Sequence, residues 1–351
     1  MMFNSDYCPN YKNIVSAAFN EKPPQIPIYE HIIAEEIMEE IMDTKFAGLQ
    51  KGDKSEKRQY IKNYTKFYKN MGYDTVSFER LITDVMPGSG ALYKNKDAII
   101  KTREDFKNYP WPKIEEQFFL KYKYFFQYLA EEMPAGMKAV GGPGNGVFEC
   151  VQDLVGFEQL CYIRGENPKL YADLFAKMGQ VMYKIWGKFL EHYEGCYALF
   201  RFGDDLGFKT STLLPPEDIK KHIIPVYSRI IELVHDYGKP FLLHSCGNIF
   251  NVMDLLIENA NINAKHSNED TIAPFSEWIN RYGDRIGNFG GVDTKFLYDK
   301  DKEEIIDYVK DIMKLAQKYE GVAVGTGNSI PDYIPVENYL IMIKTIRELR
   351  N

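Results

Sequence analysis

The chain reads ALFRF at 198–202, PFLLH at 240–244, INAKH at 262–266, IGNFG at 286–290 and VAVG at 322–325, and these five segments indicate its fold. Each segment is short and rich in residues that favour β-strands. They are spaced by roughly 25 to 40 residues, about the length of a strand followed by a crossover helix. Such alternation is typical of parallel strands joined by helices.

Three earlier segments of the same kind, at 26–29, 75–78 and 138–142, bring the number of predicted strands to eight. Helices are predicted between them. One starts at Pro215 and Pro216 and ends at Gly238, and another places apolar residues at helical spacing over 302–319. The pattern predicts an α/β fold, a (β/α)8 TIM barrel.

The first half of the chain is less regular. The charged, lysine-rich stretch 43–71 predicts an N-terminal helical extension, and 87–112, with two glycines and a Pro-Trp-Pro turn, predicts a long loop. Long loops on the active-site face of a barrel usually build the substrate side, at the carboxyl ends of the strands. No repeat or linker is evident, so residues 1–351 are expected to form a single barrel domain.

Composition excludes several classes of protein. Apolar residues make up 45% of the 351, and no apolar run approaches the roughly 18 residues of a membrane span. The net charge is -7 and the basic residues are dispersed, so nucleic acid is not an expected partner. The polar first eleven residues and five scattered cysteines, without a signal peptide or disulfide framework, favour the cytoplasm.

Polar residues follow most of the predicted strands. In a closed barrel these positions converge on one mouth, which predicts a functional site there. They are Glu30 and His31, Glu79 and Arg80, Asp204 and Asp205, 244–248 (HSCGN), 267–270 (SNED), Asp293 and 326–329 (TGNS).

The sharpest pattern at this mouth is His244-Ser245-Cys246. Two positions apart on an extended segment, the imidazole and the thiol face the same side, and together they suit zinc. The alternative is a hydrogen-bonded histidine beside an inert buried cysteine, but the position at a strand end favours a site. A catalytic metal needs a third ligand. Glu269 is the first candidate, and the weaker ones are Asp205, Glu149 and Asn328.

The pair Asp204-Asp205 follows a predicted strand and admits two interpretations. The carboxylates could orient a substrate, position His244 or accept a proton. Equally, they could cap a helix and pair with Arg201. The glycine-rich 141–146 (GGPGNG) lacks the Lys-Ser/Thr of a phosphate loop and predicts a tight turn.

Taken together, these motifs resemble the uroporphyrinogen decarboxylase superfamily. The resemblance spans about residues 26–349 and implies a (β/α)8 barrel. It is carried by GGP at 141–143, LVGFEQL at 154–160, GDD at 203–205, LPPE at 214–217, Pro225, HSCGN at 244–248, GGVDT at 290–294 and IPVEN at 334–338.

The superfamily divides by chemistry, and this chain is more similar to its corrinoid-dependent methyltransferase branch. True decarboxylases carry an arginine motif after the first strand, whereas here 29–32 (YEHI) is followed by acidic residues and no arginine before Arg58. The methyltransferases build a zinc site on a His-x-Cys that His244 and Cys246 match. Members that methylate thiols use a further cysteine near the eighth strand, where 325–328 (GTGN) has none. A carboxylate such as Glu269 would instead suit an oxygen ligand.

The resemblance therefore implies a zinc-dependent enzyme that moves methyl from a small methylated compound, expected to be methoxylated, to the cobalt of cobalamin. The chain lacks an Asp-x-His-x-x-Gly motif, so a partner corrinoid protein is expected to carry that cofactor. Asp205 or His31 would assist proton delivery. The predicted substrate-binding residues are Glu30, Asp204, Asn248 and Asn328. The alternatives are decarboxylation of a porphyrinogen or another carboxylate, and a barrel that only binds a small molecule or partner.

Overall fold

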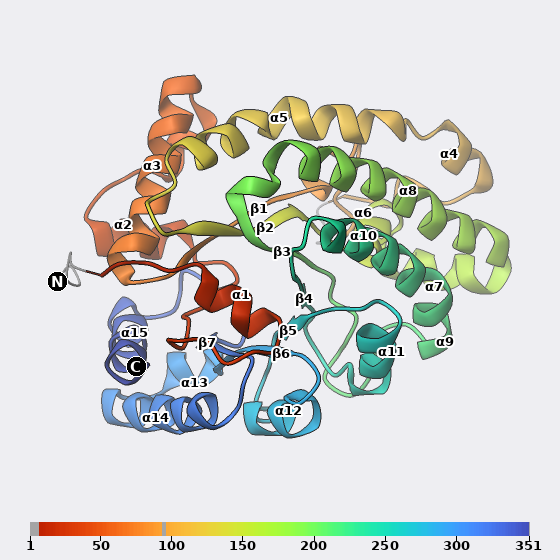
Figure 1. The fold of residues 1–351 in the computed structure, drawn as a ribbon. Coiled ribbons are helices and arrows are strands. Elements are labelled where there is room, and N and C mark those ends of the chain that lie inside the picture. Colours follow the sequence, from red (N-terminus) through yellow and green to blue (C-terminus); the bar gives the residue numbers. More distant parts are fainter. Residues whose placement is uncertain (1–6, 93–95, 351) are drawn as a thin grey trace.

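Seven parallel strands form one curled sheet, in which each strand lies next to its neighbour in the sequence (Figure 1). The computed structural model describes residues 7–92 and 96–350. The predicted α/β, TIM-barrel class is confirmed. The strands are β1 (Thr75–Leu81), β2 (Lys138–Gly144), β3 (Tyr197–Gly203), β4 (Phe241–His244), β5 (Ala264–His266), β6 (Gly287–Val292) and β7 (Val322–Thr326).

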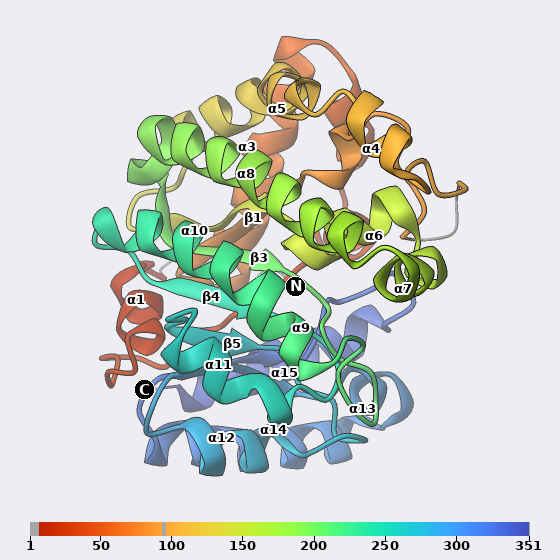
Figure 2. The same cartoon turned by 90° about the vertical axis from the view of Figure 1, so that its right-hand side faces the viewer.

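Helices surround this sheet, as Figures 1 and 2 show from two sides. The α-helices are α1 (Lys12–Ala18), α2 (Glu35–Met42), α3 (Lys54–Met71), α4 (Arg103–Asn108), α5 (Pro112–Glu131), α6 (Val147–Val155), α7 (Phe157–Glu166), α8 (Pro168–Tyr193), α9 (Pro216–Asp218), α10 (Ile224–Asp236), α11 (Met253–Glu258), α12 (Phe275–Tyr282), α13 (Thr294–Asp299), α14 (Lys302–Lys318) and α15 (Val336–Leu349). The 3₁₀ helices are η1 (Ala47–Lys51), η2 (Thr83–Val85), η3 (Glu194–Cys196) and η5 (Phe250–Val252), and η4 (Ile219–Ile223) is a π-helix.

The first predicted strand, 26–29, is an extended segment rather than a full strand. It meets β7 at a single bridge between Ile28 and Val324, with the hydrogen bonds Tyr29 N–H to Val324 O and Val324 N–H to Pro27 O, both 3.0 Å. On its other side, the Ser77 hydroxyl of β1 donates to the Glu30 carbonyl. Pro27 has no N–H to offer, which limits the ladder. The segment thus lies between the two edge strands of the sheet.

Helix α1 fills the amino end of the barrel. Its Ile14, Ala17 and Ala18 are fully buried. A Cβ on Gly287, at the start of β6, would lie 2.5 Å from the Ala17 carbonyl oxygen, so the helix rests directly on the strand. The inward-facing residues that pack with α1 are Tyr29, Val140, Ala198, Leu199, Leu242, Ala264, Phe289 and Ala323.

The N-terminal additions form a layer outside β1 and β2. The predicted helical stretch contains α3, which begins with a capping box of Asp53 and Glu56 and packs beside α5 (Figure 2). The predicted loop at 87–112 was wrong in part, because α4 lies within it and begins with a capping box of Thr102 and Asp105. Residues 93–95 of that stretch lie outside the described residues.

The predicted helices of the second half are confirmed. The first runs through α9, η4 and α10 from Pro216 to Asp236, and Gly238 follows it with a φ of 66°. The second is α14, which begins with a capping box of Asp301 and Glu304. In the part of the chain that the structure describes, no helix has the length and apolar character needed to cross a membrane.

Candidate metal centre

Two histidines end neighbouring strands at the barrel mouth and are hydrogen-bonded to each other. His244 ends β4, His266 ends β5, and they are register partners. Their Nδ1 atoms lie 2.7 Å apart, and His266 Nε2 lies 2.9 Å from the carbonyl oxygen of Thr326. Burial lowers the pKa of both imidazoles, that of His266 to about 3, so both rings are neutral at physiological pH.

These contacts determine which ring nitrogens carry protons. The Thr326 carbonyl only accepts, so His266 carries its proton on Nε2 and offers Nδ1 as an acceptor. His244 must then donate from Nδ1, which leaves a lone pair on its Nε2. A histidine oriented by a hydrogen bond on one nitrogen, with the other free, is the usual form of a metal ligand.

The free nitrogen of His244 faces a sulfur and a carboxylate. Nε2 lies 3.4 Å from Cys246 Sγ and 3.8 Å from Asp205 Oδ1, and the three ligand atoms lie within 4.8 Å of one another. Tetrahedral zinc, with bonds of about 2.3 Å to sulfur and 2.0–2.1 Å to nitrogen, places those two ligands about 3.5 Å apart. The residues therefore fit zinc.

The surroundings of Cys246 suit a metal-bound thiolate. Asn328 donates its side-chain amide to Sγ at 3.4 Å, and the Ser267 hydroxyl lies 3.8 Å away. The backbone N–H of Cys246 donates to Asp205 Oδ1 at 2.9 Å, which holds the carboxylate beside the sulfur. Burial and Asp205 raise the pKa of Cys246, so a bound cation would have to release the thiol proton.

His31 supports this centre as a stacked ring. Its ring lies 3.7 Å from that of His244 with an angle of 10° between the planes. His31, His244 and His266 also form a group of possible ligands, but the 2.7 Å between two of their nitrogens is shorter than the roughly 3.4 Å expected around tetrahedral zinc. We assign this second group to orientation of His244. His31, predicted as catalytic, thus lies against the metal centre.

Two other residues predicted for the site lie in loops beside it. Glu269, the first candidate for a third ligand, is half-buried after β5; its charge helps to raise the pKa of Cys246, but its carboxylate is outside both ligand groups of the described residues. Asn248 is half-buried, with its backbone N–H bonded to the Phe208 carbonyl at 2.7 Å. The ligand role of Glu269 and the substrate role of Asn248 stay predictions.

The predicted substrate residues Glu30 and Asp204 are engaged within the fold. Glu30 accepts the Thr326 N–H at 3.2 and 3.3 Å and also the Thr326 hydroxyl, and burial raises its pKa to about 8. Asp204 accepts two backbone N–H groups from the first turn of α6, at 3.0 and 2.8 Å, and the hydroxyl of Tyr227 at 2.6 Å. The helix-capping interpretation therefore describes Asp204, and substrate contact stays a prediction for both.

Glu149, a weaker candidate for the third ligand, lies behind Asp205. It accepts the Asn145 side-chain amide at 2.8 Å and the Asp205 N–H at 3.3 Å. Burial and the nearby Asp204 and Asp205 raise its pKa well above the usual value. A carboxyl group that keeps its proton is a poor metal ligand, so the geometry favours Asp205 over Glu149.

A buried arginine joins the centre to β1, a relationship the sequence did not reveal. Arg201 is fully buried and pairs with Glu79 at 2.9 Å, whereas pairing with Asp204 or Asp205 was one expectation. It also donates to the Tyr29 hydroxyl and the His31 carbonyl, both at 2.7 Å. The available signal was a charged residue inside an otherwise apolar predicted strand.

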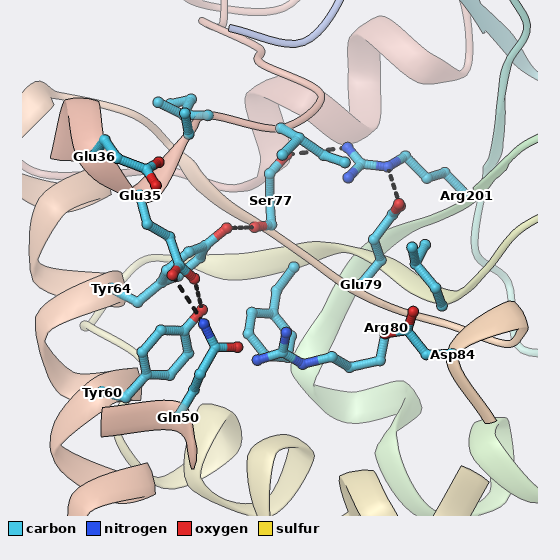
Figure 3. Close-up of a pocket in the computed structure, with 15 residues that line it drawn as sticks. Glu35, Glu36, Gln50, Tyr60, Tyr64, Ser77, Glu79, Arg80, Asp84 and Arg201 are labelled. Carbon is cyan, nitrogen blue, oxygen red and sulfur yellow. Dashed lines mark hydrogen bonds and ion pairs between the residues drawn. The ribbon is translucent and has the colours of Figure 1, made fainter. Parts of the chain in front are cut away.

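A cavity of about 370 Å³ lies beside Arg201, between β1 and the N-terminal extension (Figure 3). Its walls come from residues 32–36, from η1 and α3, and from the end of β1. That the long loops and the extension build the substrate side stays a prediction.

Comparisons with known proteins concern both the family and the fold. The family model of uroporphyrinogen decarboxylase (URO-D) matches residues 83–349. No curated protein sequence matches the chain. A methyltransferase from Methanosarcina mazei has a similar structure, with 14% identity, 97% of this chain and 99% of that chain covered, and a TM-score of 0.68. A Listeria monocytogenes protein assigned as a vitamin B12-independent methionine synthase gives 11% identity, 95% and 96% coverage, and a TM-score of 0.49.

The family match covers most of the chain, and it contains every residue of the His244, Cys246 and Asp205 group. The structural likeness to the Methanosarcina mazei enzyme extends over almost the whole of both chains and supports the same fold. This chain belongs to the uroporphyrinogen decarboxylase (URO-D) family.

Proposed function

We propose that this protein is a zinc-dependent methyltransferase that moves a methyl group from a small methoxylated compound to the cobalt of a cobalamin held by a partner corrinoid protein. The observation that carries the proposal is the 3.4 Å approach of His244 Nε2 to Cys246 Sγ at the barrel mouth. The tautomer of His244 supports it, since the nitrogen that faces the sulfur has a free lone pair.

His244, Cys246 and Asp205 would hold the zinc. Three protein ligands leave a fourth position for a substrate oxygen, as in catalytic zinc sites generally. When bound, zinc supplies a Lewis acid that makes the oxygen of a methoxy group a better leaving group. Glu269, the carboxylate predicted from the sequence, is the alternative third ligand.

The protein's own residues would orient the ligands and move a proton. In the transfer the oxygen–methyl bond breaks, a cobalt–methyl bond forms, and the oxygen keeps the bonding pair and takes a proton. Asp205 has a side chain 45% exposed, so it joins the centre to solvent. A carboxylate that binds zinc does not carry a proton, so Asp205 would deliver the proton only if Glu269 is the third ligand. With Asp205 on the zinc, proton delivery falls to His31, whose ring stacks on His244.

The size of the cavity favours this function over porphyrinogen decarboxylation. Small-molecule sites span about 300–1,000 Å³. The cavity of about 370 Å³ is at the lower end of that range, which suits one substituted ring better than a tetrapyrrole.

Elemental analysis combined with a methyl-transfer assay on free cob(I)alamin tests the proposal. Methoxylated aromatics, methylamines and thiols would serve as donors. We expect Cys246→Ala and His244→Ala to lose zinc and at least about 100-fold in turnover, because both would bind the metal. Cys161→Ala removes an exposed thiol and serves as the matched control.

Zinc-free protein with full activity would refute the mechanism. Release of CO2 from a carboxylated substrate without metal would favour the decarboxylase alternative. A barrel that only binds a ligand would keep its metal content and show no turnover to lose in Cys246→Ala.

A further inference from the structure

Arg80, near the end of β1, forms no close ion pair in the described residues, although its charge acts on the nearby Glu35. Its guanidinium carbon lies 4.4 Å from the ring centre of Phe125, 4.7 Å from Phe78 and 5.7 Å from Tyr60. Its Nε and Nη2 atoms are buried without a hydrogen-bond partner. In the described part of the chain no carboxylate forms an ion pair with it at 4.0 Å or less.

This arrangement is unfavourable unless something else pairs with the guanidinium. Arginine stays charged in proteins, and buried donors without partners carry a desolvation penalty. Ring faces attract the cation but are weak substitutes for oxygen acceptors. Arg201 shows the contrast, since its Nε, Nη1 and Nη2 all donate to neighbouring oxygens.

Two carboxylates beside Arg80 in the same cavity are already engaged. Glu35 accepts the Tyr60 hydroxyl at 2.5 Å and the Gln50 amide at 2.9 Å, and Glu79 pairs with Arg201. Glu36 and Asp84 line the cavity as well, and Asp84 accepts the Tyr122 hydroxyl at 2.8 Å. Figure 3 shows these bonds as dashed lines, with none drawn to Arg80. The cavity therefore has a positive group to offer to a ligand.

The shape of the cavity indicates what kind of anion it would take. Arg80 lines it together with the rings of Tyr60, Tyr64 and Phe78, so an aromatic body suits its walls. Its volume of about 370 Å³ suits a single substituted ring, since small-molecule sites begin near 300 Å³.

Among the described residues, the lining of the cavity includes none of the proposed zinc ligands, but two contacts connect its wall to the metal centre. Arg201 is part of its wall and donates to the His31 carbonyl at 2.7 Å. The His31 ring in turn stacks on His244 at 3.7 Å. Two contacts thus connect the cavity wall to the proposed zinc ligand.

We propose that this cavity binds a small aromatic carboxylate, whose carboxylate group pairs with Arg80 and whose ring lies against Tyr60, Tyr64 and Phe78. A planar guanidinium matches a carboxylate with two parallel hydrogen bonds. Nε and Nη2 of Arg80 are closed to solvent, so the guanidinium would turn toward the cavity to form them. Identifying this ligand with the methyl donor rests on the proposed function: the donor is then a methoxylated aromatic acid, held by its carboxylate.

Calorimetric titration of the full chain with benzoate and with benzamide tests the site. Benzamide has the same shape without the charge. We expect benzoate to bind at least about tenfold more tightly, a preference that Arg80→Met removes because the charge-assisted bonds are lost. Arg58→Met is the matched control, since Arg58 lies exposed on α3 and pairs with Glu132. The measurement requires no methyl transfer, so its failure and that of the proposed function are separate results.

Equal affinity of the wild type and Arg80→Met for benzoate would overturn the proposal, and so would equal affinity of the wild type for the two compounds. Thermal unfolding of each variant checks that it is folded. If Arg80→Met does not fold, Arg80→Lys replaces it, because lysine keeps the charge without the planar fork. We expect Arg80→Lys to bind benzoate about fivefold more weakly, and unchanged affinity would equally overturn the proposal.

Discussion

His244 and His266 share a hydrogen bond between their Nδ1 atoms, so the proton on one ring sets the ligand nitrogen of the other. His266→Phe removes the acceptor and leaves His244 free to change tautomer. We expect zinc affinity to fall about 10- to 100-fold, the usual effect of losing such a partner, while the fold is kept. Competition for zinc against a chromophoric chelator measures this. His222→Phe, far from the centre on η4, is the control, and unchanged affinity in His266→Phe would contradict the tautomer argument.

The third ligand is decided by two parallel substitutions. Asp205→Asn keeps an oxygen beside His244 Nε2 but removes its charge, so zinc affinity is expected to fall about tenfold or more. Glu269→Gln is expected to change the affinity little, because this carboxylate lies outside the ligand group. The same chelator competition reports both. The opposite pattern would restore Glu269 as the ligand.

The buried pair of Arg201 and Glu79 predicts non-additive effects on stability. Arg201→Met leaves the Glu79 carboxylate buried without its cation and is expected to lower the free energy of unfolding by about 3–5 kcal/mol. Adding Glu79→Gln removes the unpaired charge and is expected to recover part of that loss. Urea unfolding measures both variants. A double variant less stable than Arg201→Met would contradict this account of the pair.

Glu30 gives stability a defined dependence on pH. Its pKa is raised by burial to about 8 in the folded protein, against 4.5 for the exposed group, so the folded state holds an extra proton between these values. The free energy of unfolding therefore falls as pH rises through this window. Glu30→Gln is expected to reduce the fall between pH 5 and pH 8.5, measured as urea midpoints. Glu40→Gln, an exposed control on α2, should keep the full fall, and identical profiles for wild type and Glu30→Gln would refute the assignment.

The sequence predicted the fold well where the signal was local. Seven predicted strands overlap β1 to β7, since each is a short run of β-forming residues between helices. The eighth, at 26–29, has the same composition, but Pro27 and a single bridge to β7 leave it an extended segment. Backbone pairing decides whether such a segment is a strand, and composition does not record pairing.

The candidate site divides in the same way. His244 and Cys246 were predicted because they are two positions apart in one strand end. His266 was missed as a site residue although it ends a predicted strand, because its contact with His244 depends on the register of β4 and β5. Arg201 meets Glu79 across 122 positions of the chain, a separation that no local pattern spans.

Helix α1 occupies the amino end of the barrel, and His244 lies at the opposite, carboxyl end of the strands. Under the proposed function, a donor seated beside Arg80 lies beneath the surface on which a macromolecule presents its cobalt. Binding would then follow a compulsory order. The methyl donor would bind before the corrinoid protein, and the demethylated product would leave after the corrinoid protein has dissociated. Turnover would accordingly slow at high concentrations of the corrinoid protein, because corrinoid protein that binds before the methyl donor would block the donor's access to the site.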